Sequence, residues 1–192
     1  MNGRNQWDLL YELSTSQKGY FTASQAAELG VSPQALRHHV ATGNLTRVQR
    51  AIYRVTRFPE SEHEDMVVVW LWTNQKGVFS HETALLMHNL SDALPSRIHV
   101  TLPLDWRFRR LKLPPIVIAY YDDIAADDWE WVANFPVTKP LRTLDDCMNS
   151  SVSPELVSQA AEQLMKSGGF GYVPETIARA LYYRYEPGVS RR

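Results

Sequence analysis

The sequence of 192 residues has one cysteine, no long hydrophobic run and a formal net charge of only −1, and each absence narrows the class of protein. The lone Cys147 excludes an internal disulfide and a cysteine-rich zinc site, and is typical of a reducing compartment. The longest apolar stretch, Met66–Trp72, is far shorter than the ~20 residues of a membrane-spanning helix. Residues 1–20 are polar and contain no apolar segment of a secretory signal. We therefore expect a cytoplasmic protein with no membrane partner.

The charges are divided unevenly along the chain. Residues 1–58 contain seven Lys and Arg against three acidic residues, a net charge of +4, whereas residues 59–192 contain 13 against 18, a net charge of −5. A basic N-terminal region followed by an acidic one predicts a polyanionic partner for the first region alone. The length and the 44% hydrophobic content are those of one large globular domain or two small ones.

Local start and stop signals predict three short helices, over residues 5–13, 23–29 and 33–42. Thr22 is the expected N-cap of the second helix, and Gly30 ends that helix at the position after its C-cap. Ser32 and Pro33 then form the N-cap and the first position of the third helix, where the missing N–H of proline costs nothing. The short connection between the second and third helices gives the spacing of a helix-turn-helix.

Apolar and polar residues alternate on both sides of Arg50-Ala51, which predicts a two-stranded hairpin over residues 45–49 and 52–55. The residues expected to supply its apolar contacts are Leu45, Val48, Ile52, Tyr53 and Val55. A hairpin directly after the third helix is the wing of a winged helix. We therefore predict an N-terminal winged helix-turn-helix domain over residues 1–58.

Residues 59–192 are expected to form a second, mixed α/β domain with a small sheet, so that the whole chain has an α+β fold. The predicted strands are residues 97–102 and 116–121, and the predicted helices are residues 63–75, 80–88, 141–148, 153–165 and 174–185. Ser80 is the expected N-cap of the helix that it begins. The glycines of residues 168–171 are expected to form a flexible joint before the last helix.

The expected third helix has one apolar face and one polar face. Leu36 and Val40 lie one turn apart and are expected to face the core with Val31. The outward face consists of Gln34, Arg37, His38 and Ala41. On such a face glutamine pairs with adenine, arginine pairs with the O6 and N7 edge of guanine, and alanine touches the thymine methyl group. The first residues of the helix are expected to enter the major groove.

The hairpin adds residues suited to the DNA backbone. Arg47, Gln49 and Arg50 on the wing, together with Lys18 before the second helix, suit contacts to phosphates or to the minor groove. Phosphate contacts set the register of the protein on the duplex, whereas base contacts set sequence preference. The candidate DNA-binding residues are Lys18, Thr22, Ser32, Gln34, Arg37, His38, Arg47, Gln49 and Arg50.

Other clusters are weaker candidates for catalysis or metal binding. His81 and Glu82 are adjacent and point about 100° apart on a helix, and no second histidine follows at the spacing of a zinc protease. The acidic residues of 122–130 lack a nearby lysine and are interpreted as a solvated loop and a helix N-terminus, with a metal-dependent nuclease as the catalytic alternative. The basic residues of 107–112 are interpreted as a solvated loop, with a second phosphate contact or an acidic partner as alternatives. We therefore expect no enzyme, no cofactor and no metal.

Several motifs are similar to those of one known family. In the N-terminal region they are residues 19–22, Ala26, residues 30–32, Leu36, Gly43, Leu45 and residues 50–54, and further on they are residues 78–85, 94–101 and 137–146. These segments resemble AbiEi-type antitoxins, although Ala51 stands where many members have glycine. The resemblance implies a transcriptional repressor that binds its own promoter through a winged helix. It also implies a C-terminal domain that counters a nucleotidyltransferase toxin, in systems linked to phage defence.

Two functions are therefore considered. The first is a repressor and antitoxin whose partners are double-stranded DNA of its own promoter, expected to contain inverted repeats, and a nucleotidyltransferase toxin. The alternative is a winged-helix regulator whose second domain senses a ligand or dimerises, with no toxin partner. A toxin gene directly downstream would favour the first function, and a solitary gene would favour the second.

Overall fold

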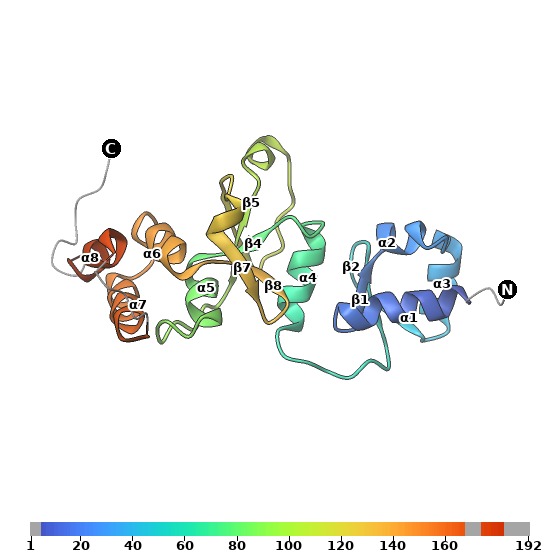
Figure 1. Ribbon diagram of the computed structural model, residues 1–192. Coiled ribbons are helices and arrows are strands. Elements are labelled where there is room, and N and C mark those ends of the chain that lie inside the picture. Colours follow the sequence, from blue (N-terminus) through green and yellow to red (C-terminus); the bar gives the residue numbers. More distant parts are fainter. Residues whose placement is uncertain (1–4, 168–173, 183–192) are drawn as a thin grey trace. The chain divides into compact units, whose positions relative to one another are not determined.

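The protein divides into two compact units, Met1–Gln75 and Lys76–Arg192, which are described separately. The computed structural model describes residues 5–167 and 174–182 (Figure 1). None of the helices within those ranges is long and apolar enough to cross a membrane. The expected joint at residues 168–171 lies outside the described residues, as do the last three residues of the helix expected over 174–185.

Three helices form where the sequence predicted them. They are α1 (Gln6–Ser16), α2 (Ala23–Glu28) and α3 (Pro33–Ala41). The predicted caps are confirmed, because the Thr22 hydroxyl accepts from the Gln25 backbone N–H and the Ser32 hydroxyl accepts from the Ala35 backbone N–H. The Gln25 side chain in turn accepts from the Thr22 backbone N–H, which completes a capping box. Gly30 follows α2 with a φ of +78°, the left-handed backbone that glycine adopts without strain.

Replacement of Thr22 by alanine is expected to lower the free energy of unfolding by about 1 kcal/mol, because it leaves the first turn of α2 without its side-chain acceptor. Urea denaturation followed by circular dichroism measures the change. Thr15→Ala is the matched control, since Thr15 is exposed inside α1 and its loss is expected to change stability by less than about 0.5 kcal/mol. Equal effects of the two substitutions would show that the capping box does not stabilise α2.

A three-stranded antiparallel sheet completes the three-helix arrangement. Its strands are β1 (Tyr20–Thr22), β2 (Leu45–Gln49) and β3 (Ile52–Val55), in the order β1-β3-β2. The predicted hairpin is confirmed, and its turn places Ala51 at a φ of +62°. The expectation that Val48 packs inward is wrong, because the register slips between Arg47 and Gln49 and leaves Val48 44% exposed on the bulge.

An apolar cluster lies between the helices and this sheet. Its fully buried members are Leu10, Phe21, Ala26, Val31, Leu36, Leu45 and Val55. Leu36 and Val31 are therefore core residues as predicted, and Val40 packs against the cluster while partly buried. Because Leu36 on α3 and Leu45 on β2 share this cluster, the third helix is fixed against the hairpin that follows it.

A fourth helix, α4 (Glu64–Trp72), is attached to the same sheet. The Tyr20 hydroxyl donates to one Glu64 carboxylate oxygen at 2.7 Å, and Arg54 pairs with the other at 3.1 Å. Burial and the adjacent carboxylate raise the pKa of Tyr20 to about 12. These contacts place α4 in the first compact unit, so the unit ends at Gln75 rather than at the residue 58 boundary expected from the linker composition.

The second unit contains a mixed five-stranded sheet. Its strands are β4 (Val78–Phe79), β5 (Ile98–Leu102), β6 (Val117–Tyr121), β7 (Trp129–Val132) and β8 (Phe135–Thr138), in the order β6-β5-β4-β8-β7. β5 and β6 confirm the two predicted strands, and they pair in parallel. β4 pairs antiparallel with β5 and parallel with β8, so the sheet has mixed direction and the α+β fold is confirmed.

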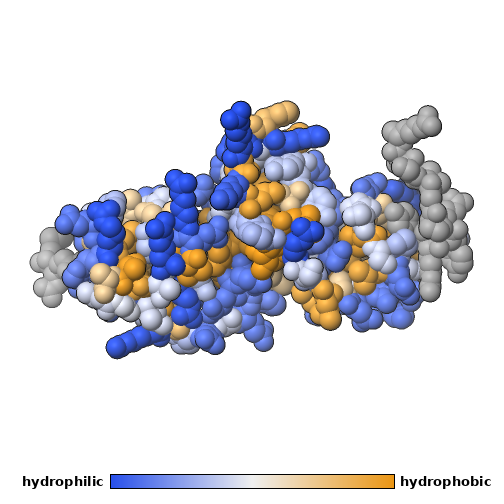
Figure 2. Space-filling view, turned by 180° about the vertical axis from the view of Figure 1, so that it is seen from behind, coloured by the Kyte–Doolittle hydropathy of each residue, from blue (hydrophilic) through white to orange (hydrophobic). Residues whose placement is uncertain are grey.

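Helices cover the rest of the second unit. They are α5 (His81–Met87), α6 (Pro140–Met148), α7 (Pro154–Ser167) and α8 (Glu175–Tyr182), with short 3-10 turns η1 (Leu104–Phe108) and η2 (Ala126–Asp128). Figure 1 shows α6, α7 and α8 gathered on one side of the sheet. Their buried cluster includes Leu85, Leu144, Cys147, Val157 and Ile177. Hydrophobic side chains also reach the surface in several places (Figure 2).

Candidate nucleic-acid interface

The outward face of α3 is exposed along its whole length. Gln34, Arg37, His38 and Ala41 are all exposed, whereas Leu36 on the opposite face is buried. Arg37 has no ion-pair partner among the residues that the structure describes. The helix therefore presents amide, guanidinium, imidazole and methyl groups to the solvent, the groups that contact base edges in a major groove.

The two predicted cap residues differ in their surroundings. Ser32 is exposed at the start of α3, next to the residues of the outward face, while its hydroxyl accepts from the Ala35 N–H. Thr22 is 8% exposed, and its hydroxyl is engaged by the Gln25 N–H and by the hydroxyl of Ser24. Ser32 therefore lies at the candidate interface, whereas the Thr22 side chain stabilises the N-terminus of α2.

The hairpin supplies two unpaired cations beside this helix. Arg47 and Arg50 are exposed, and neither has an ion-pair partner within residues 5–167 and 174–182. Gln49 is half-buried next to the turn. Guanidinium groups on a protruding hairpin are suited to phosphate oxygens or to a narrow minor groove.

Lys18 and His39, two further residues of the first unit, have structural partners. The Lys18 ammonium donates to the backbone oxygen of Glu62 at 2.8 Å, so it fastens the segment before α4 to the turn after α1. The His39 ring packs on Trp7 with ring centroids 4.8 Å apart. Burial and the neighbouring His38 lower the pKa of His39, and the ring belongs to the packing of α1 on α3.

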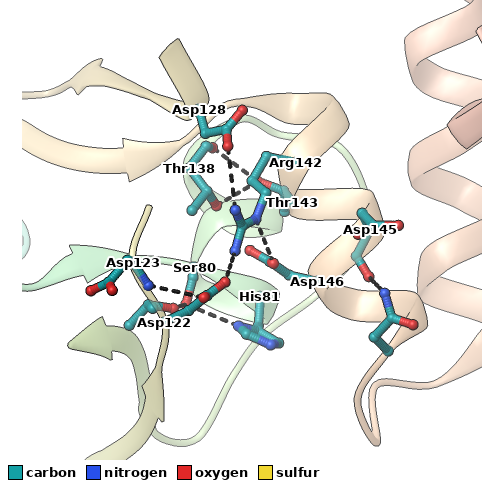
Figure 3. Close-up of polar contacts among 12 residues, drawn as sticks. Ser80, His81, Asp122, Asp123, Asp128, Thr138, Arg142, Thr143, Asp145 and Asp146 are labelled. Atoms are coloured by element: carbon teal, nitrogen blue, oxygen red, sulfur yellow. Dashed lines mark hydrogen bonds and ion pairs between the residues drawn. The ribbon is translucent and has the colours of Figure 1, made fainter. Parts of the chain in front are cut away.

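The acidic segment 122–130 is organised around a cation that the sequence analysis missed. Figure 3 shows the Arg142 guanidinium facing carboxylates that come from three different segments. It pairs with Asp122, with Asp128 at 3.3 Å and with Asp146 at 2.7 Å. The segment is solvated as expected, since Asp122 and Asp128 are 54% and 43% exposed, but both carboxylates also pair with Arg142, which the sequence analysis did not foresee. The spacing of Arg142 and Asp146 at i and i+4 was a signal for one of these pairs.

Asp146 is the most deeply buried carboxylate of this cluster, with a side chain 10% exposed. Burial raises its pKa to about 6, although the Arg142 hydrogen bond and charge oppose that shift. One of its oxygens, Oδ2, is buried without a hydrogen-bond partner. The carboxylates hold the pKa of Arg142 above its ordinary value, so the guanidinium remains charged throughout the physiological range.

A pH-dependent stability is expected from Asp146. Its folded pKa of about 6 exceeds the ordinary 3.8, so the folded protein holds this proton more tightly than the unfolded chain does. The stabilisation is complete below about pH 4 and is lost as the pH rises to about 6, by on the order of 1–3 kcal/mol. Asp146→Asn is expected to remove this decline when thermal unfolding is followed between those values. An unchanged pH slope in the variant would contradict the assignment.

The buried histidines of the second unit form a neutral, aromatic cluster. His81 stacks on Tyr120, with ring centroids 3.5 Å apart, and His99 lies 3.2 Å from the Tyr120 hydroxyl. Burial lowers the pKa of His81 to about 3 and that of His99 to about 4. Ser80 does not cap α5 as expected, because its hydroxyl accepts from Thr101 and contacts the His81 ring. In the described part of the chain, no three His, Cys, Asp or Glu side chains gather as a metal site.

The order of elements in the first unit, three helices followed by a hairpin on a three-stranded sheet, is that of a winged helix-turn-helix. Residues 8–56 match the model of a family described as "Transcriptional regulator, AbiEi antitoxin". Residues 8–56 are therefore similar to this family of antitoxin transcriptional regulators. The motifs of the second unit lie outside the matched residues, so the resemblance of residues 78–85, 94–101 and 137–146 stays a prediction.

The fold is also similar to a solved structure. The crystal structure of the RV2827C protein from Mycobacterium tuberculosis aligns with a TM-score of 0.51 at 15% sequence identity, covering 91% of this chain and 74% of that one. At this identity the likeness concerns the fold alone. No curated protein matches the chain.

Proposed function

We propose that the protein is a sequence-specific DNA-binding repressor that acts on its own promoter. The observation that carries the proposal is the exposed face of α3, with Gln34, Arg37 and His38 beside the unpaired wing cations Arg47 and Arg50. The family of residues 8–56, which is one of transcriptional regulators, supports it independently. No catalytic step, cofactor or metal is part of the proposal.

In this proposal α3 lies in the major groove, with its N-terminal half nearest the bases. Gln34 and Arg37 contact base edges, and Ser32 and His38 lie beside them. Arg47 and Arg50 contact phosphates, which fix the position of the helix without selecting a sequence. Inverted repeats in the promoter would place two such units on opposite half-sites.

A gel-shift titration tests sequence specificity. The upstream DNA of the gene is expected to bind tightly in the presence of unrelated competitor DNA, and more weakly as salt is raised from about 50 to about 200 mM. Binding that is absent, or equal for both DNAs, would overturn the proposal. The first unit would then be a protein-interaction module.

Arg37→Ala is expected to lower the affinity for operator DNA by about 1–3 kcal/mol and to leave binding to unrelated DNA nearly unchanged, because it removes a base contact. Arg50→Ala is expected to weaken binding to both DNAs by a similar factor, because it removes a phosphate contact. Fluorescence anisotropy on the two duplexes measures both effects. Arg97→Ala, an exposed arginine of the second unit, is the control. An equal loss on both duplexes would make Arg37 a phosphate contact, and a changed sequence preference would exclude that role for Arg50.

We further propose that residues 76–192 counter a nucleotidyltransferase toxin, a role supported by the antitoxin description of the family that matches the N-terminal region. The test is co-expression with the nucleotidyltransferase encoded beside the gene, using growth as the measurement. The variant with both Arg37→Ala and Arg50→Ala is expected to restore growth, since the toxin would be countered independently of DNA binding. Failure of the wild-type chain to restore growth would favour a second unit that senses a ligand or dimerises.

A further inference from the structure

The connection between β5 and β6, residues 103–116, carries the densest positive charge of the second unit. Its cations are Arg107, Arg109, Arg110 and Lys112, and its only acidic residue is Asp105. The rest of that unit is acidic, with nine Lys and Arg against 13 Asp and Glu in residues 76–102 and 117–192. We call residues 103–116 the basic loop. Figure 1 shows it rising beyond the ends of the strands, with η1 near its tip.

An aromatic ring stands exposed among these cations. Phe108 is 88% exposed, whereas Trp106, two residues earlier on η1, is 6% exposed. Leaving a phenylalanine in water forgoes about 1.5–3 kcal/mol that its burial would provide. Figure 2 shows hydrophobic and hydrophilic side chains side by side on this protrusion, at the top of the view. The basic loop therefore buries the ring of Trp106 and exposes the ring of Phe108 to solvent.

Hydrogen bonds hold the first part of the basic loop. The Leu104 N–H donates to the Asp123 carboxylate at 3.1 Å, and the Arg109 N–H donates to the Trp106 oxygen at 3.0 Å. The Arg109 guanidinium lies 4.7 Å from the centre of the Trp106 ring and pairs with Asp105. Trp106 thus anchors the loop under Arg109, and Phe108 is held on the outside between neighbouring cations.

Three of the four cations remain available to a partner. Arg107, Arg110 and Lys112 are exposed and have no ion-pair partner among the residues that the structure describes. Like charges on an exposed loop repel one another weakly in water, and an anion with several closely spaced charges would relieve that repulsion. A nucleic-acid backbone carries such charges at regular intervals.

We propose that the basic loop binds single-stranded nucleic acid, with Phe108 stacking on a base and Arg107, Arg110 and Lys112 contacting the flanking phosphates. Aromatic rings and cations combined in this way bind single strands without sequence preference, since every base has a face for stacking. A duplex is less suited, because inserting a ring between its stacked base pairs costs a few kcal/mol. An acidic protein surface would attract the cations but would not offer a series of bases on which the Phe108 ring could stack. The inference does not depend on the operator binding proposed for α3.

The test uses the full chain carrying Arg37→Ala and Arg50→Ala, so that the proposed contribution of the first unit is reduced. The probe is a labelled oligothymidylate of about 20 nucleotides, a length that exceeds the usual site of a single-strand-binding module. Fluorescence anisotropy is expected to show binding that Phe108→Ala weakens roughly 5- to 150-fold. Replacing Arg107, Arg110 and Lys112 together by alanine is expected to reduce the slope of log affinity against log salt by about 2.

Two controls separate the loop from the rest of the surface. Leu94→Ala removes another hydrophobic side chain, 87% exposed, and is expected to leave binding unchanged. Unrelated duplex DNA and polyglutamate are the competing probes, and both are expected to bind more weakly than the single strand. The proposal is overturned if oligothymidylate does not bind, if Phe108→Ala leaves its affinity unchanged, or if either competing probe binds more tightly. Tighter polyglutamate binding would assign the loop to an acidic protein partner.

Discussion

Replacement of Arg142 by alanine is expected to lower the free energy of unfolding of the second unit by about 3 kcal/mol, because a buried ion pair that loses one partner leaves an uncompensated charge. Most of this cost comes from Asp146, whose side chain is 10% exposed and already has one oxygen without a partner. Asp122 and Asp128 are 54% and 43% exposed, so water compensates much of their loss. Thermal and chemical unfolding at pH 7 measure the change.

Arg109→Ala is the matched control for this result. Its partner Asp105 is 64% exposed and Arg109 itself is 51% exposed, so the loss of that ion pair is expected to cost less than about 1 kcal/mol. The double variant with Arg142→Ala and Asp146→Asn is expected to recover part of the stability, since it removes the buried charge as well as its partner. Equal destabilisation by Arg142→Ala and Arg109→Ala would contradict a structural role for the cluster.

Phe21→Ala is expected to destabilise the first unit by about 3–5 kcal/mol and to abolish operator binding with it. Phe21 is fully buried on β1, and its ring stacks on Tyr53 of β3 at 5.9 Å between ring centroids. The substitution opens a cavity in the cluster that also holds Leu36, the residue that anchors α3. Loss of DNA binding would then follow from loss of the fold, although the ring is buried away from DNA.

The same chemical change at an exposed site separates the two effects. Phe108→Ala removes a ring that is 88% exposed and is expected to change stability by less than about 0.5 kcal/mol. Urea denaturation and anisotropy on operator DNA should be measured for both variants. If Phe21→Ala kept wild-type stability while losing operator binding, the ring would have a direct role that its burial does not suggest.

The first unit could be predicted largely from sequence because its signals are local. The N-caps Thr22 and Ser32 act within the first turn of the helix that each begins, and Gly30 acts at the end of α2. The hairpin is also local, since its strands adjoin one turn. Val48 was misplaced because a bulge inserts one residue and reverses the inside-outside alternation that the prediction assumed.

The second unit could be predicted less completely because its pairings are distant. β4 has two residues and lies between β5 and β8, so its identity as a strand depends on partners that no local pattern shows. The Arg142 cluster joins Asp122 and Arg142 across 20 positions, a contact that only the chain topology creates. Among the candidate DNA-binding residues, Thr22 and Lys18 are two whose side chains have contacts within the protein. Their side chains are engaged by Gln25 and Glu62, and sequence spacing could not reveal the second of these contacts.

The wing turn has a consequence for the entropy of binding. Ala51 adopts a left-handed φ of +62°, a backbone that costs an L-residue roughly 1–2 kcal/mol and that glycine would adopt freely. A glycine at that turn would, however, visit many other conformations in the free protein. With alanine the number of accessible backbone states is smaller, so in the proposed DNA complex the wing would lose less conformational freedom. Part of the conformational entropy of the hairpin is therefore lost during folding, before any complex forms.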